Sequence, residues 1–271
     1  MGFESIVSTI KTLPPLPESV IKLDKAFRMG QPDMKTIIDI IEHDPLLTAS
    51  ILAKVNTPVY GLKNKIVSVM QAVTLFGLST VRAFALKTAM DQNFSIDMTV
   101  YGITNEQFSK ISAMQNALMF QWFMGVDVER AKIVVPLSFL MEMGKVIIAK
   151  ELAESDYVEQ FGIDLKERMS ISECELEYAG ITSYQVSALL FRHWNFESIF
   201  SELIEAVDSQ SEMKSEEDKM IYALKAVSTA VNVKECLSDR SIEKALKFVE
   251  KMGQDTGRFT KTAIRIREKY L

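Results

Sequence analysis

The sequence predicts an all-α fold. Apolar residues recur at helical spacing along most of the 271 residues, whereas runs that alternate apolar and polar residues, as a half-buried strand does, are almost absent. Hydrophobic residues make up 48% and charged residues 25% of the chain, which is typical of a folded globular protein and not of a disordered one. Helix-start and helix-stop residues separate the apolar stretches, so each element can be justified in order.

The N-terminal part is expected to consist of short helices, because six of the seven prolines lie within the first 58 residues. Proline fits the first turn of a helix, where its missing N–H has no intrahelical acceptor to lose. Asp44-Pro45 is the clearest start, a capping carboxylate followed by proline, and Asp33 and Ser68 are further N-caps. The helices predicted from these signals cover residues 18–29, 34–42, 46–55 and 69–76, and another opens at Ser79.

Residues 92–104 lose the helical period and gather polar residues, which predicts a connector. The helices expected beyond it cover residues 105–123, 127–149 with Pro136 kinking or interrupting it, 164–179, 182–194, 197–209, 215–237, 239–252 and 255–270. Cys174 and Cys236 both fall in these helices, so a disulfide framework is not expected.

No stretch approaches the roughly 20 apolar residues of a membrane span. The N-terminus also lacks the basic and apolar regions of a secretion signal. We therefore expect a cytoplasmic protein without a membrane span.

The net charge of -5 is unevenly distributed, with +2 over residues 1–150, -13 over 151–218 and +6 over 219–271. The acidic middle would repel a phosphate backbone, which disfavours nucleic acid as a partner. Near the C-terminus, Arg258, Lys261 and Arg265 accompany apolar residues at helical spacing and predict a basic amphipathic helix. This helix either packs its apolar stripe on the body or docks on an acidic partner.

The sequence carries no recognisable catalytic or metal motif. It lacks phosphate-binding glycine loops, a G-x-S-x-G elbow, C-x-x-C and H-x-x-x-H. His43-Asp44 spells a metal-binding pair, but Pro45 follows at once and makes Asp44 a helix cap. The other histidine, His193, lies near a predicted helix end, where it suits exposed carbonyls. We expect no metal and no cofactor.

Four motifs follow one another at residues 13–17 (LPPLP), 41–47 (IEHDPLL), 55–61 (VNTPVYG) and 71–78 (QAVTLFGL). Their order and spacing resemble the HDOD domain of bacterial signalling proteins. The resemblance implies an N-terminal short-helix bundle packed on a helical part related to HD-type phosphohydrolases. We therefore divide the chain into a short-helix part at 1–95, an HD-like part at 104–210 and a C-terminal helical extension at 211–271.

The HD-like part resembles enzymes that carry a His-Asp pair before an apolar residue and Gly-Lys. This sequence has Met141 and Glu142 there, and by spacing the other ligand histidines of such enzymes would fall near Ile111 and Val207. A thioether and two alkyl side chains are poor ligands for a hard cation, and one carboxylate alone cannot build a metal site. The resemblance thus implies a pseudoenzyme.

The resemblance further implies a non-enzymatic scaffold or regulator that acts through protein–protein contacts, in behaviours such as motility, surface growth or stress response. Its partners would be signalling proteins. Two alternatives stay open, a metal-dependent HD-type phosphohydrolase and a non-hydrolytic sensor of a small nucleotide.

A cleft between residues 12–95 and 104–210 is where we expect a ligand or partner. Asn56, Tyr60 and Arg82 are its candidate polar residues. Each also has a structural explanation. Asn56 can form hydrogen bonds with the backbone groups of a turn, Tyr60 can pack its ring in the core, and Arg82 can be a solvated helix residue.

Overall fold

The computed structural model describes residues 2–30, 33–93, 97–167, 170–209 and 213–270. Regular structure in these residues is helical, and their one β-type pairing is an isolated bridge between Val231 and Cys236. The all-α prediction is confirmed.

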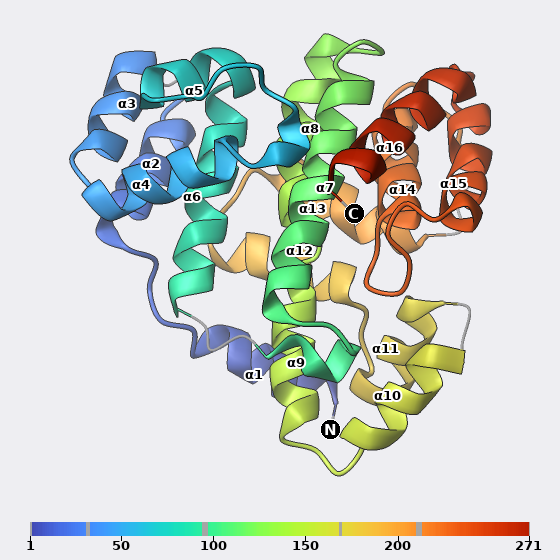
Figure 1. Ribbon diagram of the computed structural model, residues 1–271. Coiled ribbons are helices and arrows are strands. Elements are labelled where there is room, and N and C mark those ends of the chain that lie inside the picture. The colour runs from blue at the N-terminus through green and yellow to red at the C-terminus, as the bar shows by residue number, and fades with distance from the viewer. Residues whose placement is uncertain (1, 31–32, 94–96, 168–169, 210–212, 271) are drawn as a thin grey trace.

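A long helix, α7 (Asn105–Phe123), runs through the middle of the molecule (Figure 1). Thr104 and Gln107 form a reciprocal capping box at its start. It is buried on almost all sides, as expected of a core helix surrounded by others. The elements of the same central part are η2 (Met98–Tyr101), α8 (Val128–Leu140), α9 (Gly144–Ala153), α10 (Val158–Glu167), α11 (Ile171–Ala179), α12 (Ser183–His193), α13 (Ser198–Glu205) and η3 (Ala206–Asp208).

The N-terminal helices form a bundle on one side of α7, blue to cyan in Figure 1. Asp33, Asp44 and Ser68 cap three of them, each accepting a hydrogen bond from the backbone N–H three residues later. The bundle contains α2 (Glu18–Arg28), α3 (Met34–Glu42), α4 (Pro45–Val55), η1 (Pro58–Tyr60), α5 (Val69–Phe76) and α6 (Leu78–Asn93). Short helices with these caps agree with the sequence prediction.

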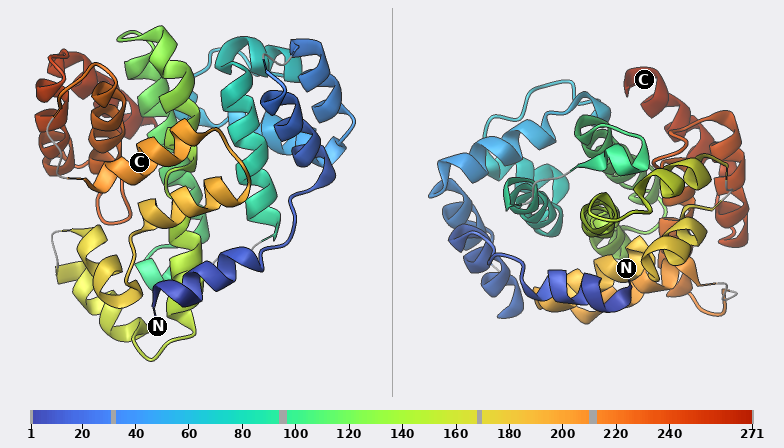
Figure 2. Two further views of the ribbon diagram at one scale, coloured as in Figure 1. Left: turned by 180° about the vertical axis from the view of Figure 1, so that it is seen from behind. Right: turned by 90° about the horizontal axis from the view of Figure 1, so that it is seen from below.

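The C-terminal helices α14 (Asp218–Ala230), α15 (Asp239–Lys251) and α16 (Thr256–Tyr270) lie on the opposite side of α7 from that bundle (Figures 1 and 2). Both α14 and α16 pack against α7. Buried apolar side chains from Ile6 to Ile266 form one continuous core. The division at residues 95, 104 and 210 remains a prediction.

Helix α1 (Phe3–Lys11) lies apart from the N-terminal bundle and packs on α9 and α12 (Figure 2). Its Ile6 and Ile10 are buried there, and hydroxyl groups of the same helix donate hydrogen bonds to Glu151 of α9. The motif analysis does not predict this helix.

Two of the predicted helices are each divided in the structure. The helix expected over 127–149 ends at Leu140 and resumes at Gly144, while Pro136 stays inside α8. The helix expected over 164–179 is replaced by α10 and α11, and residues 168–169 lie outside the described residues. The connector expected over 92–104 contains η2, with residues 94–96 likewise outside them.

Cys236 does not lie in a helix, contrary to the prediction, because α14 ends at Ala230. The side chain of Asn232 accepts hydrogen bonds from the backbone N–H groups of Lys234 and Glu235, which stabilises a turn in place of further helix. Cys174 lies in α11 as predicted.

Among the described residues, no single helix is long and apolar enough to span a membrane. The pair Val69–Phe76 and Leu78–Gln92, bent by 118°, passes that test of length and composition only when taken together.

Candidate functional site

The turn between α8 and α9 is held tightly against α12. The backbone N–H of Gly144 donates to Ser187 Oγ at 2.8 Å, and this hydroxyl donates to the carbonyl of Met141 at 3.0 Å. A Cβ atom at Gly144 would lie 1.9 Å from the carbonyl oxygen of Ser183. Only glycine permits this approach, which brings the start of α12 next to Lys145.

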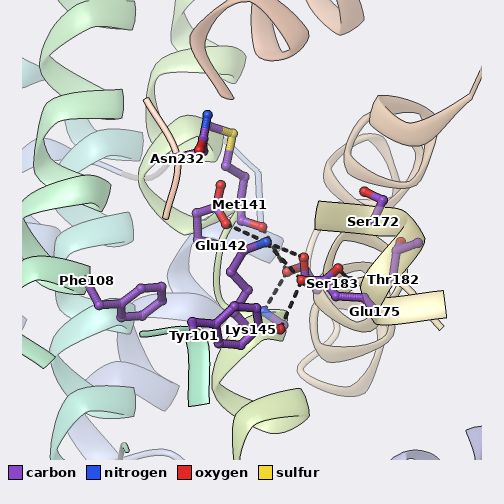
Figure 3. Close-up of polar contacts among 12 residues, drawn as sticks. Tyr101, Phe108, Met141, Glu142, Lys145, Ser172, Glu175, Thr182, Ser183 and Asn232 are labelled. Carbon is purple, nitrogen blue, oxygen red and sulfur yellow. Dashed lines mark hydrogen bonds and ion pairs between the residues drawn. The ribbon is translucent and has the colours of Figure 1, made fainter. Parts of the chain in front are cut away.

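The ammonium of Lys145 lies between two carboxylates (Figure 3). Its Nζ is 2.9 Å from Glu142 Oε2 and 3.2 Å from Glu175 Oε1, and it donates to Ser183 Oγ at 2.6 Å. Lys145 is 2% exposed, and both carboxylates are equally buried. We call Glu142, Lys145, Glu175 and Ser183 the lysine cluster.

Neutral donors also form hydrogen bonds with the two carboxylates. Tyr101 Oη donates to Glu175 Oε1 at 2.9 Å, and the backbone N–H of Ser183 donates to Glu175 Oε2 at 2.6 Å. Gln115 Nε2 donates to Glu142 Oε1 at 2.8 Å and also to the carbonyl of Val231. Helices α7, α9, α11 and α12 therefore meet at one polar cluster inside an apolar core.

The electrostatics of the lysine cluster favour a charged Lys145. Burial alone would lower the pKa of this ammonium, but Glu142 and Glu175 outweigh burial and raise the pKa above its ordinary value. The pKa of Tyr101 is raised by burial first and by Glu175 second, so its hydroxyl stays protonated and available as a donor.

A cavity of about 750 Å³ opens above the lysine cluster, with Glu142 and Lys145 in its lining. Helices α10 and α11, the segment η3, and helices α14 and α15 line it, and η3 packs on α14. Val207 and Asp208 of η3 lie in its wall. Asp208 Oδ1 accepts a hydrogen bond from Ser172 at 2.7 Å, whereas the buried Oδ2 has no hydrogen-bond partner among the described residues.

The model of the HDOD domain family matches residues 13–210, nearly three quarters of the chain. This chain belongs to the HDOD family. The match covers the bundle and the central part, including the lysine cluster, and ends before α14. No curated protein matches the sequence.

Solved structures of the same fold include three bacterial proteins, all under 25% identical to this chain. A virulence factor from Campylobacter jejuni is 23% identical with a TM-score of 0.61, and the alignment covers 99% of this chain and 96% of that one. An HDOD domain protein of unknown function from Geobacter sulfurreducens is 15% identical with a TM-score of 0.62, covering 98% and 94%. A candidate phosphohydrolase from Shewanella amazonensis is 16% identical with a TM-score of 0.65, covering 98% and 95%. These likenesses establish the fold.

Two of the positions that the resemblance assigns to lost metal ligands line the same cavity, namely Glu142, which also belongs to the lysine cluster, and Val207. The other two, Met141 and Ile111, are buried in the apolar core. Among the described residues, no group of three or more His, Cys, Asp or Glu side chains could hold a metal ion. His43 and His193 both lie at helix ends and contribute to no such group.

Asn56 and Tyr60 make internal hydrogen bonds. Asn56 Nδ2 donates to the carbonyls of Leu52 and Ile66, and its Oδ1 accepts from the Ile66 N–H, so it ties the loop after α4 to the helix end. Tyr60 is buried, and its hydroxyl donates to Asn116 Oδ1 at 2.7 Å. Neither residue lines the cavities described here, and the structural explanations weighed for both fit these contacts.

Arg82 is buried, which corrects the alternative of a solvated helix residue. It is 3% exposed, and its guanidinium pairs with Asp24 of α2 at 2.5 Å and with Glu197 before α13 at 2.6 Å. The rings of Phe27 and Phe196 each lie 4.7 Å from Arg82 Cζ. Arg82 lines a separate cavity of about 180 Å³, so the three candidate residues do not share one cleft.

The basic C-terminal helix is present as α16, and its apolar stripe packs on the body. Phe259 is buried edge-on against Trp122 of α7. Arg258 donates to the carbonyl of Gly125 at 2.9 Å and Arg265 donates to Gln121 Oε1 at 2.7 Å, while Lys261 is exposed. Two of the three proposed docking cations thus make contacts within the chain.

Sequence reasoning missed Lys145, Glu175, Tyr101 and Gln115 as members of one cluster. The burial of Glu175 was detectable from the sequence, because this residue lies on the same face of α11 as Cys174 and Ala179, whereas Glu173 and Glu177 are exposed. A carboxylate in an apolar stripe requires a partner. The identity of that partner, 30 residues earlier in the chain, has no local signal.

Proposed function

We propose that this HDOD protein is a non-enzymatic regulator of bacterial signal transduction that acts in the cytoplasm through contacts with other signalling proteins. The observation that carries the proposal is the lysine cluster, in which Lys145 Nζ lies within 3.2 Å of both buried carboxylates near the degenerate HD position.

A metal-activated water requires a divalent cation held by several ligands with an open coordination position. At Glu142 and Glu175 a positive charge is already supplied by Lys145, so a cation in the same place would be repelled. Tyr101, Gln115 and Ser183 occupy further lone pairs of the carboxylates. The two carboxylates therefore already have an ammonium and neutral donors as partners, which supports a structural role.

Signalling is supported by membership of the HDOD family. A protein from Marinobacter aquaeolei with the same fold, named a candidate signal transduction protein, is 16% identical with a TM-score of 0.69; this chain spans 58% of that protein. The neighbour named as a candidate phosphohydrolase motivates the competing enzymatic hypothesis.

The enzymatic alternative is tested on protein purified without chelator. We expect no stoichiometric manganese, iron or zinc by elemental analysis, and no turnover of a generic phosphodiester with added Mn²⁺. Stoichiometric metal together with turnover that disappears in Glu142→Ala would overturn the proposal. A Glu159→Ala variant, which changes an exposed carboxylate on α10 outside the cavity lining, is the matched control.

Regulation through protein contacts is tested by affinity capture of the tagged chain from its native cells, quantified by mass spectrometry. We expect a stoichiometric signalling protein that also binds when both purified components are mixed. Absence of such a partner across several growth states would contradict the scaffold function and favour a ligand sensor.

A further inference from the structure

From the wall that α14 and α15 contribute to the 750 Å³ cavity, we infer that it binds a phosphorylated ligand of nucleotide size, with the phosphate on this wall. Both helices lie beyond residue 210, where the HDOD match ends, so the wall comes from the C-terminal extension. The inference rests on the proposed function in one respect: the ligand is bound without being cleaved.

The first step is the charge of the α14–α15 wall. Lys225, Lys234, Arg240 and Lys244 line it, and Glu235 is the one carboxylate that these two helices and the turn between them add to the lining. Arg240 and Lys244 both face that carboxylate at 3.8 Å, which is a loose contact. The wall therefore has an excess of positive charge toward the cavity.

Lys225 is the key residue because its charge is buried. It is 8% exposed, and its ammonium donates to the backbone carbonyl of Ser209. Among the described residues, no carboxylate oxygen lies within ion-pair distance of this ammonium. Burial lowers its pKa, Asp208 opposes this effect, and Lys251 adds to it. A bound anion stabilises a buried ammonium more than it stabilises an ammonium that is exposed to solvent.

The side of the cavity formed by α10 and α11 carries the carboxylates Glu167 and Glu173 together with Lys166. Asp208 lies on η3, which packs on α14, and its buried Oδ2 has no hydrogen-bond partner among the described residues. These carboxylates repel phosphate but accept hydrogen bonds from hydroxyl or amino groups. The cavity thus favours a ligand with an anion at the α14–α15 wall and hydrogen-bond donors directed at Asp208 and at the carboxylates of α10 and α11.

The volume of the cavity and the aromatic side chains in its lining favour a nucleotide over a free phosphate. A volume of about 750 Å³ is in the range of small-molecule sites. Phe248 and Tyr184 also line the cavity and offer aromatic surface to a base. Glu142 and Lys145 of the lysine cluster also line the cavity, so the ligand meets an ion pair there.

The test is calorimetric titration of the full chain with a nucleoside monophosphate, the matching nucleoside and inorganic phosphate. We expect the monophosphate to bind and to raise the melting temperature, with weaker binding at higher salt. The nucleoside and inorganic phosphate should each bind at least about tenfold more weakly, because each makes only part of these contacts.

Variants locate the site. Lys225→Gln should weaken monophosphate binding about tenfold, since it removes one charge-assisted hydrogen bond. Because Lys225 is buried, the double variant Arg240→Gln/Lys244→Gln, at one exposed and one half-buried position, provides a second test outside the core. Lys247→Gln, an exposed lysine on the same helix α15 outside the cavity lining, is the matched control and should bind like the wild type.

Failure of all four common monophosphates to bind at millimolar concentration, or equal binding by the wild type and both cavity variants, would overturn the inference. Equal affinity for inorganic phosphate would overturn the nucleotide-sized ligand. Phosphorus NMR of the same samples separates the two proposals, because release of phosphate would refute the non-enzymatic function while leaving binding at the wall intact.

Discussion

At the scale of single residues, Lys145 determines the charge balance of the lysine cluster, because its ammonium is the counterion of both Glu142 and Glu175. Removing a partner from a buried ion pair leaves an uncompensated charge, which costs far more than an exposed pair contributes. Glu142 and Glu175 both depend on Lys145, and no other cation of the described residues lies within ion-pair distance of either.

We therefore predict that Lys145→Met destabilises the protein by about 3–5 kcal/mol at pH 7, because two buried carboxylates lose their counterion. Urea unfolding followed by circular dichroism measures this change. Lys150→Met, at an exposed position of the same helix, should change stability by less than about 0.5 kcal/mol. Similar stabilities for the two variants would contradict the role assigned to Lys145.

A second residue-scale prediction concerns Asp44, whose pKa is lowered by the backbone N–H of Leu47 first and by Ser19 second. A lowered folded-state pKa stabilises the protein above the unfolded value of about 3.9, and the contribution disappears as pH falls through the folded value. Asp44→Ala should cost about 1 kcal/mol at pH 7 and much less at pH 3. Thermal melts of both proteins at the two pH values provide the comparison; a pH-independent difference would contradict the cap assignment.

These residues also show what sequence can and cannot predict. Asp44 is predictable because a helix cap depends on neighbours within three residues. The pairing of Lys145 with Glu175 depends on the packing of α9 on α11 and on the close approach of α12 at Gly144, and neither contact has a signal in the local sequence. Arg82 was recognised as a candidate polar residue, but its burial between Phe27 and Phe196 depends on three distant segments.

At the scale of elements, α16 shows why a basic amphipathic pattern alone does not define a docking surface. The sequence predicted the helix and its apolar stripe, and the structure assigns that stripe to the contact with α7. Two helix ends were harder to predict. The break at 141–143 is stabilised by a tertiary hydrogen bond from Ser187, and the segment 231–236 is held in a turn by the side chain of Asn232.

For α16 we predict that Phe259→Ala costs about 3–5 kcal/mol, the range for removing a buried aromatic ring, whereas Lys261→Glu changes stability by less than about 0.5 kcal/mol.

The double variant Arg258→Glu/Arg265→Glu should lower the melting temperature, because it removes hydrogen bonds to Gly125 and Gln121. Differential scanning calorimetry resolves all three. An unchanged melting temperature in the double variant, combined with lost partner capture, would favour the docking helix instead.

At the scale of the whole molecule, Arg82 links the N-terminal bundle to the HD-like part. Its guanidinium contacts Asp24 on α2 from one side and Glu197, which precedes α13, from the other. Asp24 is itself buried, and burial raises its pKa despite the opposing effect of Arg82 and Arg28. A ligand or partner that moves α13 would therefore act on the bundle in part through this side chain.

Arg82→Met should destabilise the protein by about 3 kcal/mol at pH 7, near the lower end for a broken buried pair because Arg28 still faces Asp24 at 3.0 Å. An acid with a raised folded-state pKa costs stability as pH rises above its unfolded value of about 3.9, so the loss should shrink toward pH 4. Adding Asp24→Asn should recover part of the loss at pH 7, which a double-mutant cycle measures.

Lys22→Met is the control, because it removes an exposed pair with Glu18 on α2, the helix that also carries Asp24, and it should cost less than about 1 kcal/mol. Strict additivity of Arg82→Met and Asp24→Asn at every pH would mean that the bundle and the HD-like part are not coupled through this ion pair.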